Sequence, residues 1–154
     1  MGTPAYMDPK AINAITVHCA ATPRGRDVKA ATISKWDQDK FGQTSYHYVI
    51  ELDGSIVQTL RHDQRGAHTG GHNTGNLGVC YVGGVEANKA MTPADTRTPE
   101  QKSAMETLLK QLRAKYPRAI IRGHRDWPNV NKACPSFDVA SWCAGRGIDA
   151  DPTR

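Results

Sequence analysis

The sequence predicts one α/β domain in which helices flank a central mixed β-sheet. Its length of 154 residues suits a single domain. Short apolar segments and three helical patterns follow one another in the order β-α-β-β-β-α-β-α, which is typical of an α/β fold. Two of the predicted strands form a hairpin, so the sheet cannot be purely parallel. A hydrophobic share of 38% and a charged share of 23% exclude a disordered, fibrous or coiled-coil chain.

The first predicted elements are a strand and a helix. The apolar run Ala11 to Val17 indicates a buried strand that ends at His18. Asp27 is predicted to cap a helix that runs to about Phe41. The residues expected on the inner face of this helix are Val28, Ala31 and Trp36.

The hairpin, a long polar loop and another strand come next. Residues 45–51 and 55–60 are rich in β-forming side chains, and the Asp53-Gly54 turn joins them. Residues 61–76 form a polar loop rich in Gly and His. Leu77 to Val82 is apolar and indicates another strand.

The second half of the chain contains the clearest helix signal. In Thr98-Pro99-Glu100-Gln101, Thr98 is the expected cap, Pro99 the first helical residue and Gln101 the third. The apolar residues that then repeat at helical spacing are Met105, Leu108, Leu109, Leu112 and Tyr116. A short strand over residues 119–122 and a loop over 123–135 precede a short closing helix over 138–144.

Charge and cysteine usage narrow the classes of partner and site. The net charge is +5, but Lys and Arg are scattered with no run of five, so nucleic-acid binding is not expected. The absence of a CxxC pair excludes a zinc ribbon and a thioredoxin motif. Three of the four cysteines, Cys19, Cys80 and Cys143, are expected to be small core residues.

The chain carries no stretch that predicts insertion into or export across a membrane. No window approaches the roughly 18 to 20 unbroken apolar residues that a membrane span needs. Met1 to Pro9 lacks a basic region followed by an apolar core, so no Sec signal peptide is expected. Synthesis in a cytoplasm is therefore predicted, and action outside the membrane would need another export route.

Two histidines and a cysteine form a candidate metal site. His18 closes the first predicted strand, and His124 opens the loop after the last one. If these strands are neighbours, both imidazoles emerge at one sheet edge, and the loop can fold Cys134 back to them. Two imidazoles and one thiolate leave a fourth tetrahedral position for water, which is the catalytic rather than the structural zinc pattern. Asp126 could orient a ligand histidine.

The chain resembles the zinc-dependent N-acetylmuramoyl-L-alanine amidases, a family related to the animal peptidoglycan-recognition proteins. It is most similar to the short phage endolysins known as phage lysozymes. The resemblance covers about residues 12–145. The matching segments are Ile15–Thr22, Tyr46–Ile50 with Asp53-Gly54, Gly66–His68, Asn76–Val79, Gly123-His124 and Lys132–Phe137. Each is weak alone, but six in the right order and at the right separations are specific.

The resemblance implies a reaction and a set of residues for it. His18, His124 and Cys134 would bind one Zn²⁺, and Tyr46 and Lys132 would be the catalytic side chains. The reaction would hydrolyse the amide between the lactyl group of N-acetylmuramic acid and L-alanine in bacterial peptidoglycan. The implied boundaries are an N-terminal extension over 1–11, a zinc amidase domain over 12–146 and a flexible tail over 147–154. A positively charged surface would suit anionic wall polymers.

Further residues are candidates for substrate contact or support. His68 lies on the loop that lines the substrate groove in relatives, where it is either a substrate contact or a plain loop residue. Asn76 and Trp127 are also expected to bind substrate, although Trp127 could equally pack the loop. His47 alternates with Tyr46 along a strand, so it should face away from the site. His62 and His72 are expected to be solvated.

Several alternatives to a wall-lysing endolysin remain open. Cytosolic amidases that recycle muropeptides carry Asp where this chain has Cys134, and they use a Glu that is not found at Tyr46, so that role is disfavoured. Some recognition proteins bind peptidoglycan without cutting it, but those lose the cysteine ligand. Some phage relatives also bind their phage's RNA polymerase, and no motif here corresponds to that. A secreted effector that attacks the walls of rival cells is the last alternative.

Overall fold

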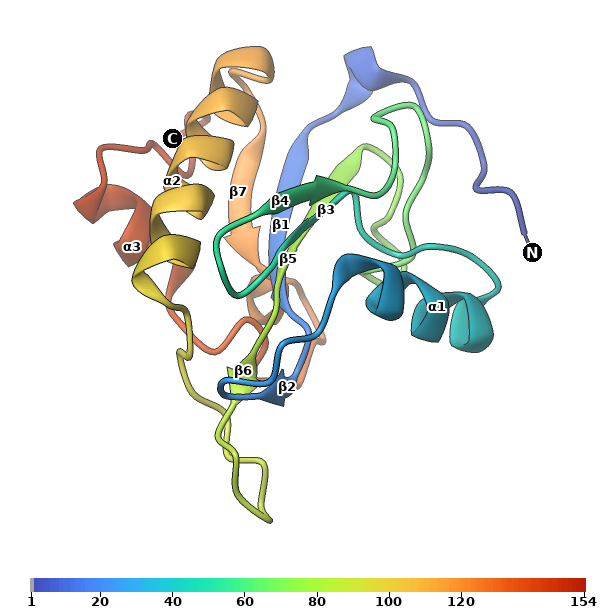
Figure 1. Cartoon of the computed structure of the whole chain (residues 1–154). Helices are drawn as coiled ribbons and strands as arrows, with labels where there is room; N and C mark the ends of the chain where they lie inside the picture. Colours follow the sequence, from blue (N-terminus) through green and yellow to red (C-terminus); the bar gives the residue numbers. More distant parts are fainter. Residues whose placement is uncertain (1) are drawn as a thin grey trace.

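A five-stranded mixed sheet forms the centre of the domain, as the computed structural model of residues 2–154 describes it (Figure 1). The strand order is β4-β3-β5-β1-β7. The strands are β1 (Ala14–Cys19), β3 (Tyr48–Ile50), β4 (Ile56–Gln58), β5 (Asn76–Tyr81) and β7 (Ile120–Gly123). All neighbours are parallel except β4, which returns antiparallel to β3 around the predicted turn. The predicted single α/β domain with a mixed sheet is thus confirmed.

Three helices flank the sheet, with α2 and α3 on one side and α1 on the other (Figure 1). They are α1 (Ala30–Phe41), α2 (Pro99–Lys115) and α3 (Val139–Gly145). A second, two-stranded sheet pairs β2 (Thr22–Pro23) with β6 (Gly84–Val85), and the sequence did not predict it. Short 3₁₀ turns lie at η1 (Pro9–Ala11) and η2 (His124–Asp126).

Helix α2 covers the apolar face of the sheet. Both halves of its predicted capping box are present, since the Thr98 side chain accepts from the Gln101 amide and the Gln101 side chain accepts from the Thr98 amide. The residues predicted on its inner face, Met105, Leu108, Leu109, Leu112 and Tyr116, are all buried. They pack with Ile15 and Val17 of β1 in the main core. Burying one such side chain contributes about 1.5–3 kcal/mol.

Helix α1 begins later than expected and turns a different face to the protein. Its N-cap residue is Lys29 rather than Asp27, and the Lys29 side chain makes no capping hydrogen bond. The Ala30 amide instead donates to Oε2 of Glu51, at the end of β3. Ile33 is buried, whereas Trp36 is 47% exposed. The predicted cap and the predicted inward position of Trp36 are therefore wrong, because a distant carboxylate sets where the helix starts.

The opposite face of the central strands is polar. Side chains alternate along a strand, so Thr16 and His18 point away from the α2 side. Thr16 donates through Oγ1 to Oδ1 of Asn76 on β5, at 2.8 Å. Trp127, just after η2, donates from Nε1 to Thr16 Oγ1 at 2.9 Å. This polar face, beneath Trp127, holds the candidate site.

Both ends of the described chain pack against the domain. Met7 is buried in the main core, and its amide donates to the Asp63 carbonyl. Ile148 and Ala150 are also buried there, and the Ala150 carbonyl accepts from the Ile121 amide of β7. The segment expected as a flexible tail from residue 147 is therefore held by core contacts and an extra strand-like hydrogen bond.

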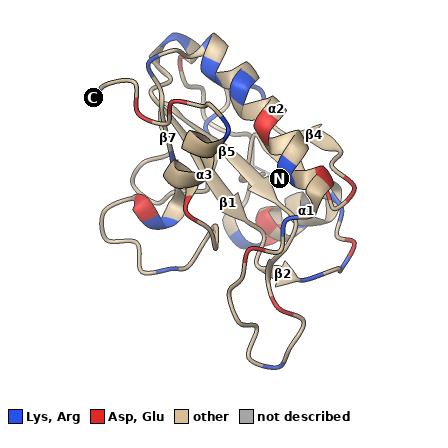
Figure 2. Ribbon diagram, turned by 90° about the vertical axis from the view of Figure 1, so that its left-hand side faces the viewer, with Lys and Arg blue, Asp and Glu red and all other residues tan. Residues whose placement is uncertain are grey.

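Charged residues are spread over several elements, with Lys and Arg interleaved with Asp and Glu (Figure 2). This agrees with the scatter of the basic residues along the sequence. Within residues 2–154, no helix combines the length and the apolar character that a membrane crossing requires.

Candidate metal centre

Two neighbouring parallel strands bring His18 and His124 together. β1 pairs with β7 in a register that places Val17 opposite Gly123, so the next residue of each chain segment is a histidine. The two imidazole centroids lie 4.6 Å apart. β1 ends one residue later than predicted, at Cys19, and the first and last strands of the sheet are neighbours, as the candidate metal site requires.

Cys134 completes a set of three donors. Its Sγ lies 3.9 Å from His18 Nδ1, and it accepts a hydrogen bond from the Cys19 amide at 3.2 Å. One ligand atom from each of His18, His124 and Cys134 lies within 4.8 Å of the others. Zn–N and Zn–S bonds in a tetrahedron place such atoms about 3.3–3.6 Å apart. The donor types therefore fit zinc, and the donor atoms would need to move only slightly closer together to bind it.

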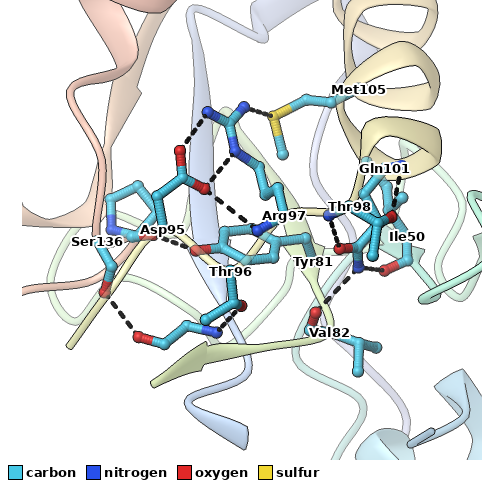
Figure 3. Close-up of polar contacts among 12 residues, drawn as sticks. Ile50, Tyr81, Val82, Asp95, Thr96, Arg97, Thr98, Gln101, Met105 and Ser136 are labelled. Carbon is cyan, nitrogen blue, oxygen red and sulfur yellow. Dashed lines mark hydrogen bonds and ion pairs between the residues drawn. The ribbon is translucent and has the colours of Figure 1, made fainter. Parts of the chain in front are cut away.

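The residues that directly follow Cys134 are anchored to other parts of the domain (Figure 3). Tyr81 of β5 donates from its hydroxyl to the Pro135 carbonyl at 2.6 Å, and Ser136 donates to the Gly84 carbonyl at 3.0 Å. The guanidinium of buried Arg97 lies 3.4 Å from the centroid of the Phe137 ring. These contacts fix the residues directly after Cys134, so its thiol is positioned before any ligand arrives.

The electrostatics of the site keep both imidazoles neutral. Burial, followed by the neighbouring His68, His124 and Lys132, lowers the pKa of His18 well below its usual value. Burial and the charge of Lys132 lower the pKa of His124 as well. A hydrogen bond with the Cys19 thiol, together with burial, raises the pKa of Cys134. A neutral imidazole is ready to bind a metal, whereas the thiol releases its proton when it binds one.

The two predicted catalytic residues lie beside the donors. The Tyr46 ring centroid is 5.2 Å from that of His18, and burial raises the pKa of its hydroxyl well above the usual value. Tyr46 therefore keeps its proton at neutral pH. Lys132 is exposed on the Cys134 loop, close enough for its charge to act on both histidines.

A cavity of about 510 Å³ lies near the start of β1, and its lining does not include the three donors. Its wall includes Trp127, which contacts Thr16, two residues before His18 on the same face. The His72 ring stacks on Trp127 with centroids 4.6 Å apart. The other lining residues are Asn13, Arg65, Gly71, Asn73, Thr74 and Asn76. His72 is exposed, as predicted, but the sequence did not predict its stack on Trp127, because no local pattern links two residues so far apart.

The other two predicted substrate contacts are buried and have internal partners. Asn76 is 1% exposed, and its amide group bonds to Thr16 and to the His72 carbonyl. His68 is 8% exposed and lies against His18. Burial lowers the pKa of His68 to about 3, with a smaller contribution from His47. Both side chains thus bond within the protein, while Asn76 also lines the cavity, and their contact with substrate stays a prediction.

Three further expectations concern support residues. Asp126 accepts from the Gly123 amide at 2.9 Å rather than from a ligand histidine, so its predicted orienting role is wrong. His47 faces away from the donors as predicted, with its ring nitrogens bonded to the Gly78 amide and the Gln64 carbonyl. His62 is only partly exposed to solvent and bridges the hydroxyls of Tyr48 and Tyr116, which the sequence did not predict.

Fold and donors together define an α/β protein with a three-donor, metal-type site at one end of neighbouring strands of a mixed sheet. The family model of N-acetylmuramoyl-L-alanine amidases matches residues 8–137. The chain therefore belongs to the N-acetylmuramoyl-L-alanine amidase family.

Similar proteins agree with this membership. The endolysin of Enterobacteria phage K11 is 39% identical over 127 residues, which cover 82% of each chain. Among solved structures, the N-acetylmuramoyl-L-alanine amidase LysC from Clostridium intestinale has a TM-score of 0.74 at 19% identity, covering 97% of this chain and 95% of that one. Drosophila peptidoglycan recognition protein SD has a TM-score of 0.72 at 21% identity, covering 100% and 90%. These two likenesses concern the fold.

Proposed function

We propose that this protein is a zinc-dependent amidase that cuts the bond between N-acetylmuramic acid and L-alanine in bacterial peptidoglycan. The observation that carries the proposal is the cluster of His18, His124 and Cys134, whose donor atoms lie within 4.8 Å of one another. Membership of the amidase family supplies the substrate class. Retention of the cysteine argues for cutting rather than binding alone.

In this proposal His18, His124 and Cys134 would hold one Zn²⁺. When bound, the ion would supply Lewis-acid chemistry, polarising the scissile carbonyl and lowering the pKa of the attacking water toward about 7. His18 and His124 arrive as neutral ligands because burial holds their pKa values low. The Cys19 amide, which donates to Cys134 Sγ, stabilises the thiolate.

Tyr46 and Lys132 would act on the charge that develops at the scissile carbonyl. The Tyr46 hydroxyl, protonated because of its burial, can donate a hydrogen bond to the oxyanion. The Lys132 ammonium can offset the same negative charge, and it is a candidate to give a proton from Nζ to the leaving amine. Trp127 and His72 would contact a part of the substrate that extends from the scissile bond into the cavity near the start of β1.

The biological role we propose is lysis of a bacterial host wall by a phage endolysin. The support is the 36–39% identity to endolysins of several phages over more than four-fifths of the chain. Synthesis in the host cytoplasm followed by action on the wall belongs to this proposal. Binding to a phage RNA polymerase stays a prediction, which a pull-down with the cognate polymerase and a transcription assay would check.

A pair of cysteine variants tests the metal site. Cys134→Ser is expected to lose both bound zinc and release of stem peptides from peptidoglycan, measured by metal analysis and mass spectrometry. Cys143→Ser is the matched control, since Cys143 is buried in α3 within the core and is not among the donors. Full activity of Cys134→Ser, or equal loss in both variants, would contradict the proposed site.

A further inference from the structure

His18 and His68 form a hydrogen-bonded pair of imidazoles. His18 Nε2 and His68 Nδ1 are 2.9 Å apart, with the rings edge to face. The other nitrogen of His68, Nε2, lies 3.1 Å from the backbone carbonyl oxygen of Asn76. The hydroxyl of Thr69 is 3.0 Å from His68 Nδ1. Both histidines are buried, at 2% and 8% exposure, so water does not compete for these contacts.

The backbone carbonyl of Asn76 determines which ring nitrogen of His68, and in turn of His18, carries the proton. A carbonyl oxygen only accepts, so His68 Nε2 must carry a hydrogen to bond it. In a neutral imidazole, Nδ1 of His68 is then the acceptor. His18 Nε2 must therefore donate to it, which leaves His18 Nδ1 with a free lone pair. That nitrogen is the one 3.9 Å from Cys134 Sγ.

The opposite arrangement is internally consistent but unfavourable. If His68 carried its hydrogen on Nδ1, its Nε2 lone pair would face the Asn76 oxygen at 3.1 Å without a proton between them. His18 would then accept at Nε2 and carry its own hydrogen on Nδ1. A protonated Nδ1 cannot bind a metal, so this arrangement would disable the site.

We infer that His68 is a positioning residue for His18. The Asn76 carbonyl fixes the proton of His68 on Nε2, so His68 Nδ1 accepts a hydrogen bond from His18 Nε2, and His18 Nδ1 stays free for the metal. The inference rests on the zinc site of the proposed function and deepens it. Ligand histidines commonly donate their second N–H to a carboxylate, carbonyl or water, and here a second histidine takes that place. His68 acts through His18 and does not contact the reacting atoms.

Two glycines hold the His68 ring in the required position. A Cβ on Gly78 of β5 would lie 2.8 Å from Cγ and Cδ2 of His68, and one on Gly66 would lie 2.8 Å from Cδ2. The ring therefore rests directly on the backbone of β5, and a side chain at position 78 would clash with it. Gly78→Ala should displace the ring and disturb His18 without removing any polar group.

Nitrogen-15 NMR of the metal-free wild-type protein tests the tautomers directly. We expect the proton of His18 on Nε2 and that of His68 on Nε2, each seen through its coupling to the ring nitrogens. A proton on His18 Nδ1, or on His68 Nδ1, would overturn the inference. This measurement needs no zinc, so it is independent of the proposed function. Failure of the wild-type protein to bind zinc would instead contradict that function.

Three variants test the consequence for the metal. His68→Phe keeps a ring but removes the acceptor, and should lower zinc affinity by about 10- to 100-fold in a chelator competition. His68→Asn should recover part of that affinity, since its Oδ1 can take the place of Nδ1. His62→Phe is the matched control and should bind zinc as the wild type does. Wild-type affinity in His68→Phe, or no recovery in a folded His68→Asn, would contradict the positioning role.

Discussion

The hydrogen bond from Tyr81 to the loop that carries Cys134 allows a prediction with a calculable size. The Tyr81 hydroxyl donates to the Pro135 carbonyl at 2.6 Å, and the Tyr81 ring is fully buried. Tyr81→Phe would keep the ring and remove the donor, which leaves a buried carbonyl unpaired. Such a group costs about 1–3 kcal/mol, so the free energy of unfolding should fall by that amount. Because Pro135 follows Cys134, zinc affinity should fall as well.

Urea denaturation of the metal-free protein and a zinc competition assay measure the two effects. Tyr48→Phe is the matched control, because the Tyr48 hydroxyl bonds to His62 in a half-buried position where water can replace it. Its unfolding free energy should change by about 1 kcal/mol or less. If Tyr81→Phe were as stable as the wild type and bound zinc as tightly, the loop would not be anchored as described.

Three other outcomes are expected. Lys132→Ala should keep its zinc and its fold but lose about 100- to 1000-fold in rate on peptidoglycan, as when an oxyanion partner is lost, and an unchanged rate would reject that role. Burial lowers the pKa of His47 from 6.5 to about 4. The folded protein then binds fewer protons than the unfolded one, so the stability present above pH 6.5 should fall by about 3 kcal/mol as the pH drops to 4. His47→Gln should flatten this decline in urea titrations at several pH values, and an equally steep decline would contradict it. Thr98→Ala should lower the unfolding free energy by about 1 kcal/mol through loss of the α2 cap, and no change in urea denaturation would mean that the cap is not needed.

Local signals predicted the elements that depend on local contacts. The cap of α2 lies within four consecutive residues, Thr98 to Gln101, and its inner face repeats at helical spacing, so both could be predicted. The start of α1 could not, because Glu51 accepts from the Ala30 amide across 21 positions of sequence. The packing of Ile148 and Ala150 was missed for a similar reason, since two apolar residues carry no periodicity.

In the candidate site, too, some features could be predicted from the sequence and others depend on contacts between distant residues. His18 and His124 were expected to meet if the first and last strands are neighbours, and the pairing of β1 with β7 meets that condition. Cys134 could then reach them from the loop that follows the last strand. The partner of His68 was not predictable, because 50 positions separate it from His18. The available signal was a histidine in a polar loop, which was equally consistent with a substrate contact and with a plain loop residue.

Digestion of purified peptidoglycan sacculi, followed by mass spectrometry, tests the zinc amidase most directly. The digestion would be run with the protein as purified, after treatment with a zinc chelator, and after zinc is restored. The account predicts free stem peptides that begin with L-alanine, their loss with the chelator and their return with zinc. Release that is indifferent to the chelator would contradict the metal site. Cut glycan strands that still carry their peptides would contradict the amidase assignment.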